Sequence, residues 1–94
     1  MKIGCPKEIK PQEFRVGMTP NAAYEAVNKG HEVVIEAGAG IGAGFDDAAY
    51  TDAGATLLAT AKEVFDSADM IVKVKEPQAV ERKMLREGQI LFTY

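Results

Sequence analysis

The sequence predicts an α/β fold, an open, doubly wound, mostly parallel sheet of about five strands with flanking helices. The first reason is that short apolar segments alternate with segments of helical character along the whole chain. Such alternation is typical of strand–helix–strand units with right-handed crossovers. The second reason is size, because 94 residues suffice for one small domain and no repeat or linker divides them. We therefore expect residues 1–94 to fold as one unit.

Local signals place the individual elements. Thr19 followed by Pro20 is a strong helix start, because threonine caps free N–H groups and proline fits the first helical position. Thr60 and Glu63 have the spacing of a capping box. Gly30 suits the left-handed position just past a helix end. The expected helices span 19–29, 47–52, 60–65 and 77–86, and the expected strands span 2–5, 31–36, 55–58, 70–75 and 89–94.

Residues 38–44 contain four alternating glycines directly after the second expected strand. Gly38, Gly40 and Ala43 satisfy the G-x-G-x-x-A spacing of a dinucleotide fingerprint. That fingerprint must open straight into a helix whose N-terminus holds the pyrophosphate, whereas two aspartates follow here and would repel phosphate. The favoured interpretation is a glycine-rich turn, with one of the aspartates at 46–47 capping the next helix.

Composition excludes several classes of function. The net charge of -3 gives no basic footprint for nucleic acid. No apolar run approaches the roughly 20 residues of a membrane span, and the N-terminus has no signal-peptide pattern. The single cysteine, Cys5, cannot form an internal disulfide and is interpreted as a core residue, which fits a cytoplasmic location. No Cys/His cluster is available for a metal.

The connection between Pro6 and Met18 is longer than the roughly two to six residues that suffice to turn a chain, and it carries both signs of charge. Arg15 in this loop has two open interpretations. It could be a solvated surface arginine, or it could clamp an anion, because guanidinium matches a carboxylate. Its position favours the clamp, since ligands of open parallel sheets bind beyond the carboxyl ends of the strands.

Lys75 is expected at the end of the fourth strand, on the same edge of the sheet as Arg15. The alternative is a lysine that reaches toward water, and Lys73 shares its parity along the strand, so one of the two could pack along a helix. His31, the only histidine, precedes the second strand and is therefore expected on the opposite edge.

The last expected strand runs to Tyr94 with no polar residue after it. Natural termini are usually polar, so we expect the chain to be part of a longer protein. We also expect the isolated chain to associate through the apolar surface of that strand.

Residues 4–20 resemble the N-terminal signature of the alanine dehydrogenase and pyridine-nucleotide transhydrogenase family. Gln12 departs from the signature, in which asparagine is usual. The matching signature residues are Gly4, Pro6, Glu8, Glu13, Arg15, Val16, Thr19 and Pro20. The resemblance continues along the chain in the segments 30–33, 36–40, 52–55, 73–77 and 88–94.

This resemblance implies a Rossmann-like substrate domain, of which residues 1–94 would be the N-terminal part. It implies that Arg15 clamps the carboxylate of L-alanine or pyruvate, and that Lys75 is a catalytic residue that binds the substrate and polarises its carbonyl or imine. Tyr94 would lie near the substrate. The family's catalytic histidine and its NAD-binding domain are expected beyond Tyr94, and family members are commonly homo-oligomers, often hexamers.

Two alternatives to an alanine dehydrogenase fragment remain at this stage. One is the N-terminal part of an NAD(P) transhydrogenase α subunit, which shares the opening signature. The segments 73–77 and 88–94 are more similar to alanine dehydrogenase. The other is a non-catalytic module that binds a small molecule.

Overall fold

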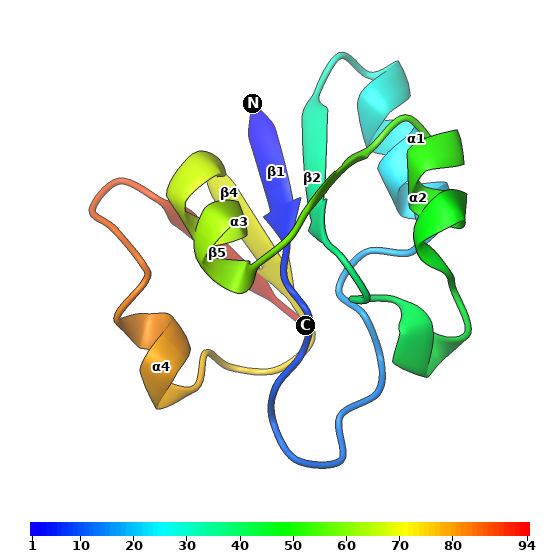
Figure 1. Ribbon diagram of the computed structural model, residues 1–94. Helices are drawn as coiled ribbons and strands as arrows, with labels where there is room; N and C mark the ends of the chain where they lie inside the picture. The colour runs from blue at the N-terminus through cyan, green and yellow to red at the C-terminus, as the bar shows by residue number, and fades with distance from the viewer.

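The computed structural model describes all residues from Met1 to Tyr94 and contains one five-stranded sheet in the order β3-β2-β1-β4-β5 (Figure 1). All four strand pairs are parallel, so the predicted α/β fold is confirmed. The strands are β1 (Lys2–Cys5), β2 (Glu32–Glu36), β3 (Thr56–Leu58), β4 (Met70–Lys73) and β5 (Ile90–Thr93). The helices are α1 (Pro20–Asn28), α2 (Asp47–Asp52), α3 (Ala61–Ser67) and α4 (Ala79–Arg82), with a 3₁₀ turn η1 (Ile41–Ala43).

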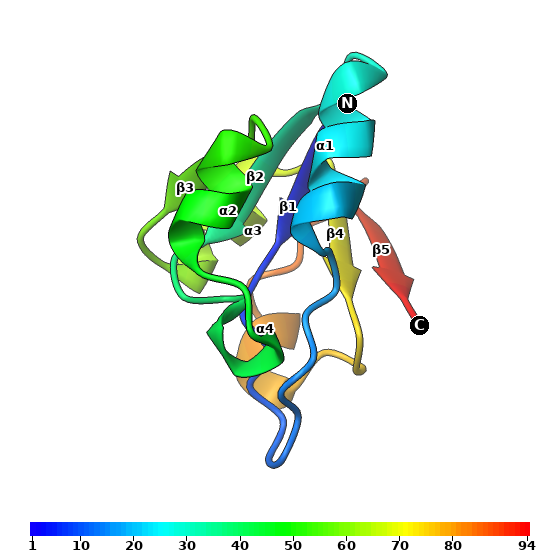
Figure 2. The same ribbon diagram turned by 90° about the vertical axis from the view of Figure 1, so that its right-hand side faces the viewer.

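The sheet is covered on both faces, which explains the nearly continuous apolar runs of its central strands. Helices α1 and α2 lie over one face and α3 lies over the other, as the two views together show (Figures 1 and 2). Ile35 of β2 belongs to the larger core cluster, whereas its neighbour Val34 packs with Phe65 of α3 in the second cluster. Gly4 lets α3 approach the sheet, since a Cβ there would lie 2.7 Å from that of Ala68.

Three of the four predicted helix starts are confirmed by their caps, whereas the helix expected from residue 77 starts at Ala79. The Thr19 hydroxyl accepts a hydrogen bond from the Ala22 amide at 3.1 Å, and Thr60 likewise caps α3. Asp46 caps α2 by accepting from the Ala49 amide at 3.0 Å. Its neighbour Asp47 instead accepts from the Gly38 amide at 2.8 Å and so ties the glycine-rich turn to the helix. Caps of this kind contribute about 1 kcal/mol each.

Two predicted elements are too long, and the helix expected over 60–65 instead continues to Ser67. The helix expected over 77–86 is only α4, whose residues are followed by turns up to Gly88. The strand expected over 70–75 ends at Lys73. Its next two amides, those of Val74 and Lys75, donate to the carboxylate of Glu8 and therefore leave the sheet's hydrogen-bond ladder.

The strand order fixes where a ligand can bind. Successive strands run outward from β1 to β3, and the chain then returns to place β4 on the other side of β1. The order therefore reverses between β1 and β4, and open α/β sheets bind ligands at the carboxyl ends of the strands at this point. The loop after β1 projects from that edge, on the same side as η1 and α4 (Figures 1 and 2). His31 precedes β2 and lies at the opposite edge, as expected.

Candidate functional site at the switch point of the sheet

The loop between β1 and α1 lies against the end of β4. Gly17 makes this approach possible, because a Cβ there would lie 2.7 Å from the carbonyl oxygen of Val72. An ion pair between Lys10 and Glu76 joins the loop to the segment after β4, and its hydrogen bond lowers the pKa of Glu76. The loop that carries Arg15 and the segment that carries Lys75 are thus attached to each other directly.

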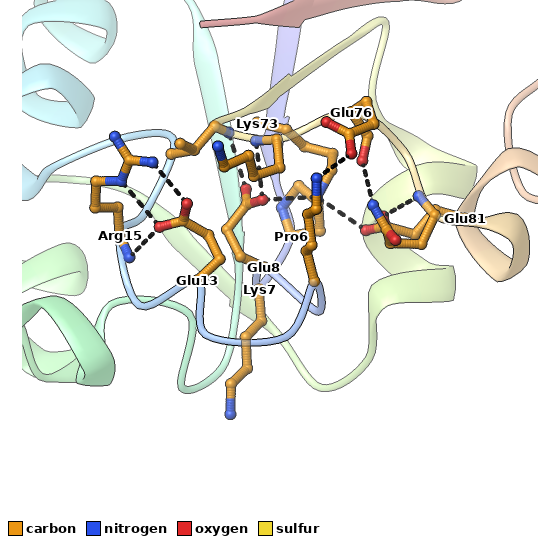
Figure 3. A network of polar contacts seen from close by, with 12 residues as sticks. Pro6, Lys7, Glu8, Glu13, Arg15, Lys73, Glu76 and Glu81 are labelled. Carbon is orange, nitrogen blue, oxygen red and sulfur yellow. Dashed lines mark hydrogen bonds and ion pairs between the residues drawn. The ribbon is translucent and has the colours of Figure 1, made fainter.

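Arg15 is held by a carboxylate of its own loop (Figure 3). Its Nε donates to Glu13 Oε2 at 2.9 Å and its Nη2 donates to Glu13 Oε1 at 2.7 Å. The Arg15 backbone amide also donates to Glu13 Oε2, at 2.9 Å. These bonds, with smaller contributions from the charges of Arg15 and Lys75, lower the pKa of Glu13 to about 2. The same contact raises the pKa of Arg15.

The contact with Glu13 uses only one edge of the guanidinium. Nη1 makes no hydrogen bond within the chain, and 67% of the Arg15 side chain is exposed, against 6% for Glu13. A planar fork held at one edge can still bind a second carboxylate at the other. Arg15 is therefore oriented by the fold and remains open to an anion.

A pocket of about 460 Å³ opens beside Arg15. Six of its nine lining residues are hydrophobic, and Arg15 is the only charged residue among them. This combination is typical of a site for a small anion that also presents an apolar part. The pocket is lined by Arg15, Val16, Gly17, Thr19, Ala22, Ala43, Phe45, Val74 and Tyr94.

Tyr94 closes one side of this pocket. Its hydroxyl donates to the carbonyl oxygen of Gly17 at 2.8 Å, and its ring meets that of Phe92 edge-on, with the centroids 5.5 Å apart. Although the residue is 75% exposed, its hydroxyl is fixed on the loop that carries Arg15. The structure therefore brings Tyr94 and Arg15, two of the three residues predicted from the sequence, to one pocket.

Lys75, the third predicted residue, does not line the pocket. It lies two residues past the end of β4, and its backbone amide donates to Glu8 Oε1 at 3.2 Å. The Lys75 ammonium makes no hydrogen bond or ion pair within the chain, and its charge contributes to the lowered pKa of Glu13. Lys75 is thus near the Glu13–Arg15 pair and free to contact a ligand.

Lys73, Glu8 and Glu81 form a buried ion cluster (Figure 3). The Lys73 ammonium donates to Glu8 Oε1 at 3.0 Å and lies 3.1 Å from Glu81 Oε2 of α4. All three side chains are about 1% exposed. Glu81 Oε1 accepts from the Gln78 amide at 2.9 Å, whereas its Oε2 has only the charge contact with Lys73. Such a cluster is costly to bury, so each hydrogen bond that satisfies it fixes the local geometry.

Two further polar side chains near this edge, Cys5 and Tyr50, are fully buried. Burial raises the pKa of the Cys5 thiol to about 12, so the nucleophilic thiolate is disfavoured there. Burial also raises the pKa of Tyr50, whose hydroxyl donates to the Met18 carbonyl oxygen at 2.7 Å. No group of three or more His, Cys, Asp or Glu residues could hold a metal ion.

The glycine-rich segment does not fit a dinucleotide. It leads into η1, which has three residues, and the helix that follows carries the Asp46 carboxylate on its N-terminus. A pyrophosphate needs free backbone amides at a helix N-terminus, and the Asp46 carboxylate would repel it.

A comparison with protein families decides the relationship. Residues 4–94 match the family described as the N-terminal domain of alanine dehydrogenase/PNT. The chain belongs to the alanine dehydrogenase/PNT family. The resemblance noted from the signature residues is thereby confirmed.

Curated relatives of this family match over the whole chain. The chain is 57% identical to the alanine dehydrogenase of Methanococcus maripaludis, 51% to that of Mycobacterium tuberculosis and 49% to that of Bacillus subtilis. Each alignment covers 100% of this chain and 25% of the relative. The chain therefore spans about a quarter of the length of these alanine dehydrogenases.

Two solved structures of the family share the fold. An L-alanine dehydrogenase superposes with a TM-score of 0.96 at 52% identity, over 100% of this chain and 26% of that one. A transhydrogenase from Sinorhizobium meliloti superposes with a TM-score of 0.92 at 34% identity, over 99% of this chain and 26% of that one. Both branches of the family share the backbone, and the sequence is closer to the dehydrogenase.

Sequence reasoning missed the acidic half of the site. Glu8 and Glu13 were recognised only as signature residues, and Glu81 was not singled out at all. The signal in the sequence was the position of Lys73 within an expected strand. A lysine inside a sheet that is covered on both faces requires a carboxylate partner.

Proposed function

We propose that this chain is the N-terminal part of the substrate-binding domain of an NAD-dependent L-alanine dehydrogenase. The observation that carries the proposal is the identity of 49–57%, along all 94 residues, to proteins named alanine dehydrogenase. The net reaction is the reversible conversion of L-alanine, NAD⁺ and water to pyruvate, ammonium, NADH and a proton. The single charged residue in the pocket, Arg15, supports a small carboxylate as substrate.

In this proposal Arg15 clamps the substrate carboxylate through its Nη1/Nη2 edge. Glu13 holds the other edge, so the guanidinium need not be ordered when substrate arrives. Fixing the carboxylate fixes the orientation of the α-carbon, and this orientation is what a stereospecific reaction at that carbon requires. The apolar wall formed by Ala22, Ala43 and Phe45 suits the methyl group of alanine.

Lys75 binds the substrate from the segment after β4 and acts as the catalytic residue of this chain. Its unpaired ammonium can donate to the carbonyl or imine and stabilise the negative charge that develops there. Tyr94 contributes a wall of the pocket and positions the Arg15 loop through Gly17.

The cofactor, NAD, is expected to bind residues outside this chain, because the glycine-rich segment does not fit it. We also expect the remaining acid–base group of the reaction, a histidine, beyond Tyr94. By the same resemblance we propose a cytoplasmic homo-oligomer, a hexamer in the intact enzyme. The helices all lack the combination of length and hydropathy that a membrane-spanning helix needs.

The transhydrogenase branch is the second candidate, and its similar backbone at a TM-score of 0.92 is the observation in its favour. A transhydrogenase subunit needs no pyruvate site, so pyruvate would not protect it or act as its substrate. A non-catalytic binding module would bind a carboxylate without turnover. Substrate dependence therefore separates the three.

The proposal is tested on the intact polypeptide that contains these residues. We expect it to oxidise NADH when pyruvate and ammonia are both present. Arg15→Ala should lower kcat/KM for pyruvate by about 100-fold or more, since two hydrogen bonds to a charged group are lost. Arg82→Ala, which removes an exposed arginine of α4, serves as the matched control and should change little.

Three results would contradict the proposal. The first is hydride transfer between nicotinamide nucleotides without any pyruvate dependence. The second is pyruvate binding without turnover. The third is an Arg15→Ala variant with the same kcat/KM as the Arg82→Ala control.

A further inference from the structure

The carboxylate of Glu8 belongs to the ion cluster and also contacts the backbone of Lys75 (Figure 3). Its Oε1 accepts from the Lys73 ammonium at 3.0 Å and from the Lys75 amide at 3.2 Å. Its Oε2 accepts from the Val74 amide at 3.0 Å. A single side chain from the loop after β1 therefore satisfies three donors at the end of β4.

This arrangement does more than neutralise Lys73. Glu81 already lies 3.1 Å from the Lys73 ammonium, so the cluster holds two carboxylates for one buried ammonium. One carboxylate would suffice for charge balance. The other carboxylate, that of Glu8, also accepts hydrogen bonds from two backbone amides. Hydrogen bonds to a buried carboxylate are strong because the acceptor is charged.

The contact has a direct consequence for Lys75. Glu8 accepts hydrogen bonds from the amides of Val74 and Lys75, which lie just past the end of β4. These two residues are therefore not held by pairing with a neighbouring strand. The Lys75 side chain has no partner of its own within the chain. The backbone that Glu8 anchors therefore fixes the position from which the Lys75 side chain extends.

We infer that Glu8 is the positioning residue for Lys75, which it aims at the substrate by fixing the backbone of residues 74–75. The inference rests on the proposed function, because it assigns Lys75 to the substrate. Glu8 itself does not touch the ligand in this account. It connects the loop that carries Arg15 to the segment that carries Lys75, so the two substrate contacts keep a fixed separation.

The first test needs no ligand and uses amide hydrogen exchange of the native chain. We expect the Val74 and Lys75 amides to be protected although they lie outside the strand. Glu8→Gln should accelerate their exchange by about tenfold or more, because a charged acceptor is replaced by a neutral one. Glu81→Gln is the matched control: it removes a carboxylate from the same ammonium without touching either amide, so their protection should persist.

The second test measures pyruvate affinity through amide chemical shifts. Glu8→Gln should weaken pyruvate binding by about tenfold in the native background and by less than about twofold in a Lys75→Met background, since the two residues act through one contact. A merely structural role would weaken binding equally in both backgrounds. Glu81→Gln should leave the affinity unchanged at temperatures where the variant is folded.

Several outcomes would overturn the inference. One is native Val74 and Lys75 amides that exchange as fast as those of an unstructured peptide. Another is an equal loss of protection in Glu81→Gln. If Glu8→Gln does not fold, Glu8→Asp replaces it, because aspartate keeps the charge but withdraws the carboxylate by one methylene. Exchange of the Val74 and Lys75 amides at the native rate in Glu8→Asp would likewise overturn the inference. If the native chain binds no pyruvate while the intact polypeptide turns it over, the proposed function stands and the affinity test moves to the intact polypeptide. If the intact polypeptide does not turn over pyruvate, the proposed function fails, while the exchange experiment still tests whether Glu8 anchors the backbone of residues 74–75.

Discussion

Arg15 and Glu13 form the contact on which the proposed substrate site depends. Glu13 is a carboxylate two residues from the arginine, and it uses both oxygens on one edge of the guanidinium. The fold thereby removes much of the side-chain freedom that an exposed arginine would lose on binding. This pairing also gives the site a measurable titration.

We predict an unusually acidic titration of Glu13. Hydrogen bonds from Arg15 lower its pKa from the ordinary 4.5 to about 2. Because the pKa in the folded chain is the lower one, the pair stabilises the fold above pH 4.5 and that contribution is lost as the pH falls toward 2. Carbon-detected NMR of the side-chain carboxyl group should show a midpoint near 2 in the native chain.

Arg15→Ala provides the control for this titration. Without the guanidinium the midpoint should move back toward the ordinary value of glutamate. A native midpoint at that ordinary value, unchanged by the substitution, would show that the Glu13–Arg15 contact does not form in solution.

Lys73 and Lys75 show where prediction from single residues stops. Their parity along the strand suggested that one of the two would pack along a helix, but nothing in the local sequence said which. The outcome depends on Glu8, which is 65 residues away from Lys73 in the chain. Contacts of this kind are decided by the assembled sheet and cannot be derived from local propensity.

Among the elements, helix starts were predicted better than helix and strand ends. Thr19, Asp46 and Thr60 act through bonds to amides three residues away, so the relevant information is local. The end of β4 is different, because it is set by the distant Glu8 carboxylate. The short α4 likewise places the Glu81 carboxylate against Lys73 of the sheet.

Strand β5 is the most exposed apolar element of the chain. It pairs with β4 on one side only, and all four of its residues are exposed. Ile90 is 48% exposed and Phe92 is 51% exposed. An apolar edge strand without a partner is a template for pairing with another chain.

We therefore predict that the isolated chain associates with itself through β5. Its mass by light scattering should rise with concentration, and Ile90→Lys should reduce the rise because a charged edge resists pairing. Tyr24→Lys is the matched control, since Tyr24 is 49% exposed on α1, which packs against β2 and α2. A native chain that stays monomeric at high concentration would contradict the prediction.

At the scale of the whole molecule, the sheet order accounts for the site. Alternating strands and helices predicted a parallel sheet, and a parallel sheet places every strand-leaving loop on one edge. The sequence alone did not predict the order β3-β2-β1-β4-β5, which puts the loops after β1 and β4 side by side. It also did not predict that Lys75 would stand apart from the pocket that Arg15 and Tyr94 share.

The most direct test of the account is a titration of pyruvate into this chain, followed by amide chemical shifts. The account predicts shifts at millimolar pyruvate around the pocket, lost in Arg15→Ala and kept in Arg82→Ala. The amides expected to shift are those of Arg15, Val16, Gly17, Thr19, Val74 and Tyr94. No shifts, or shifts that persist in Arg15→Ala, would contradict a preformed carboxylate clamp at the switch point of the sheet.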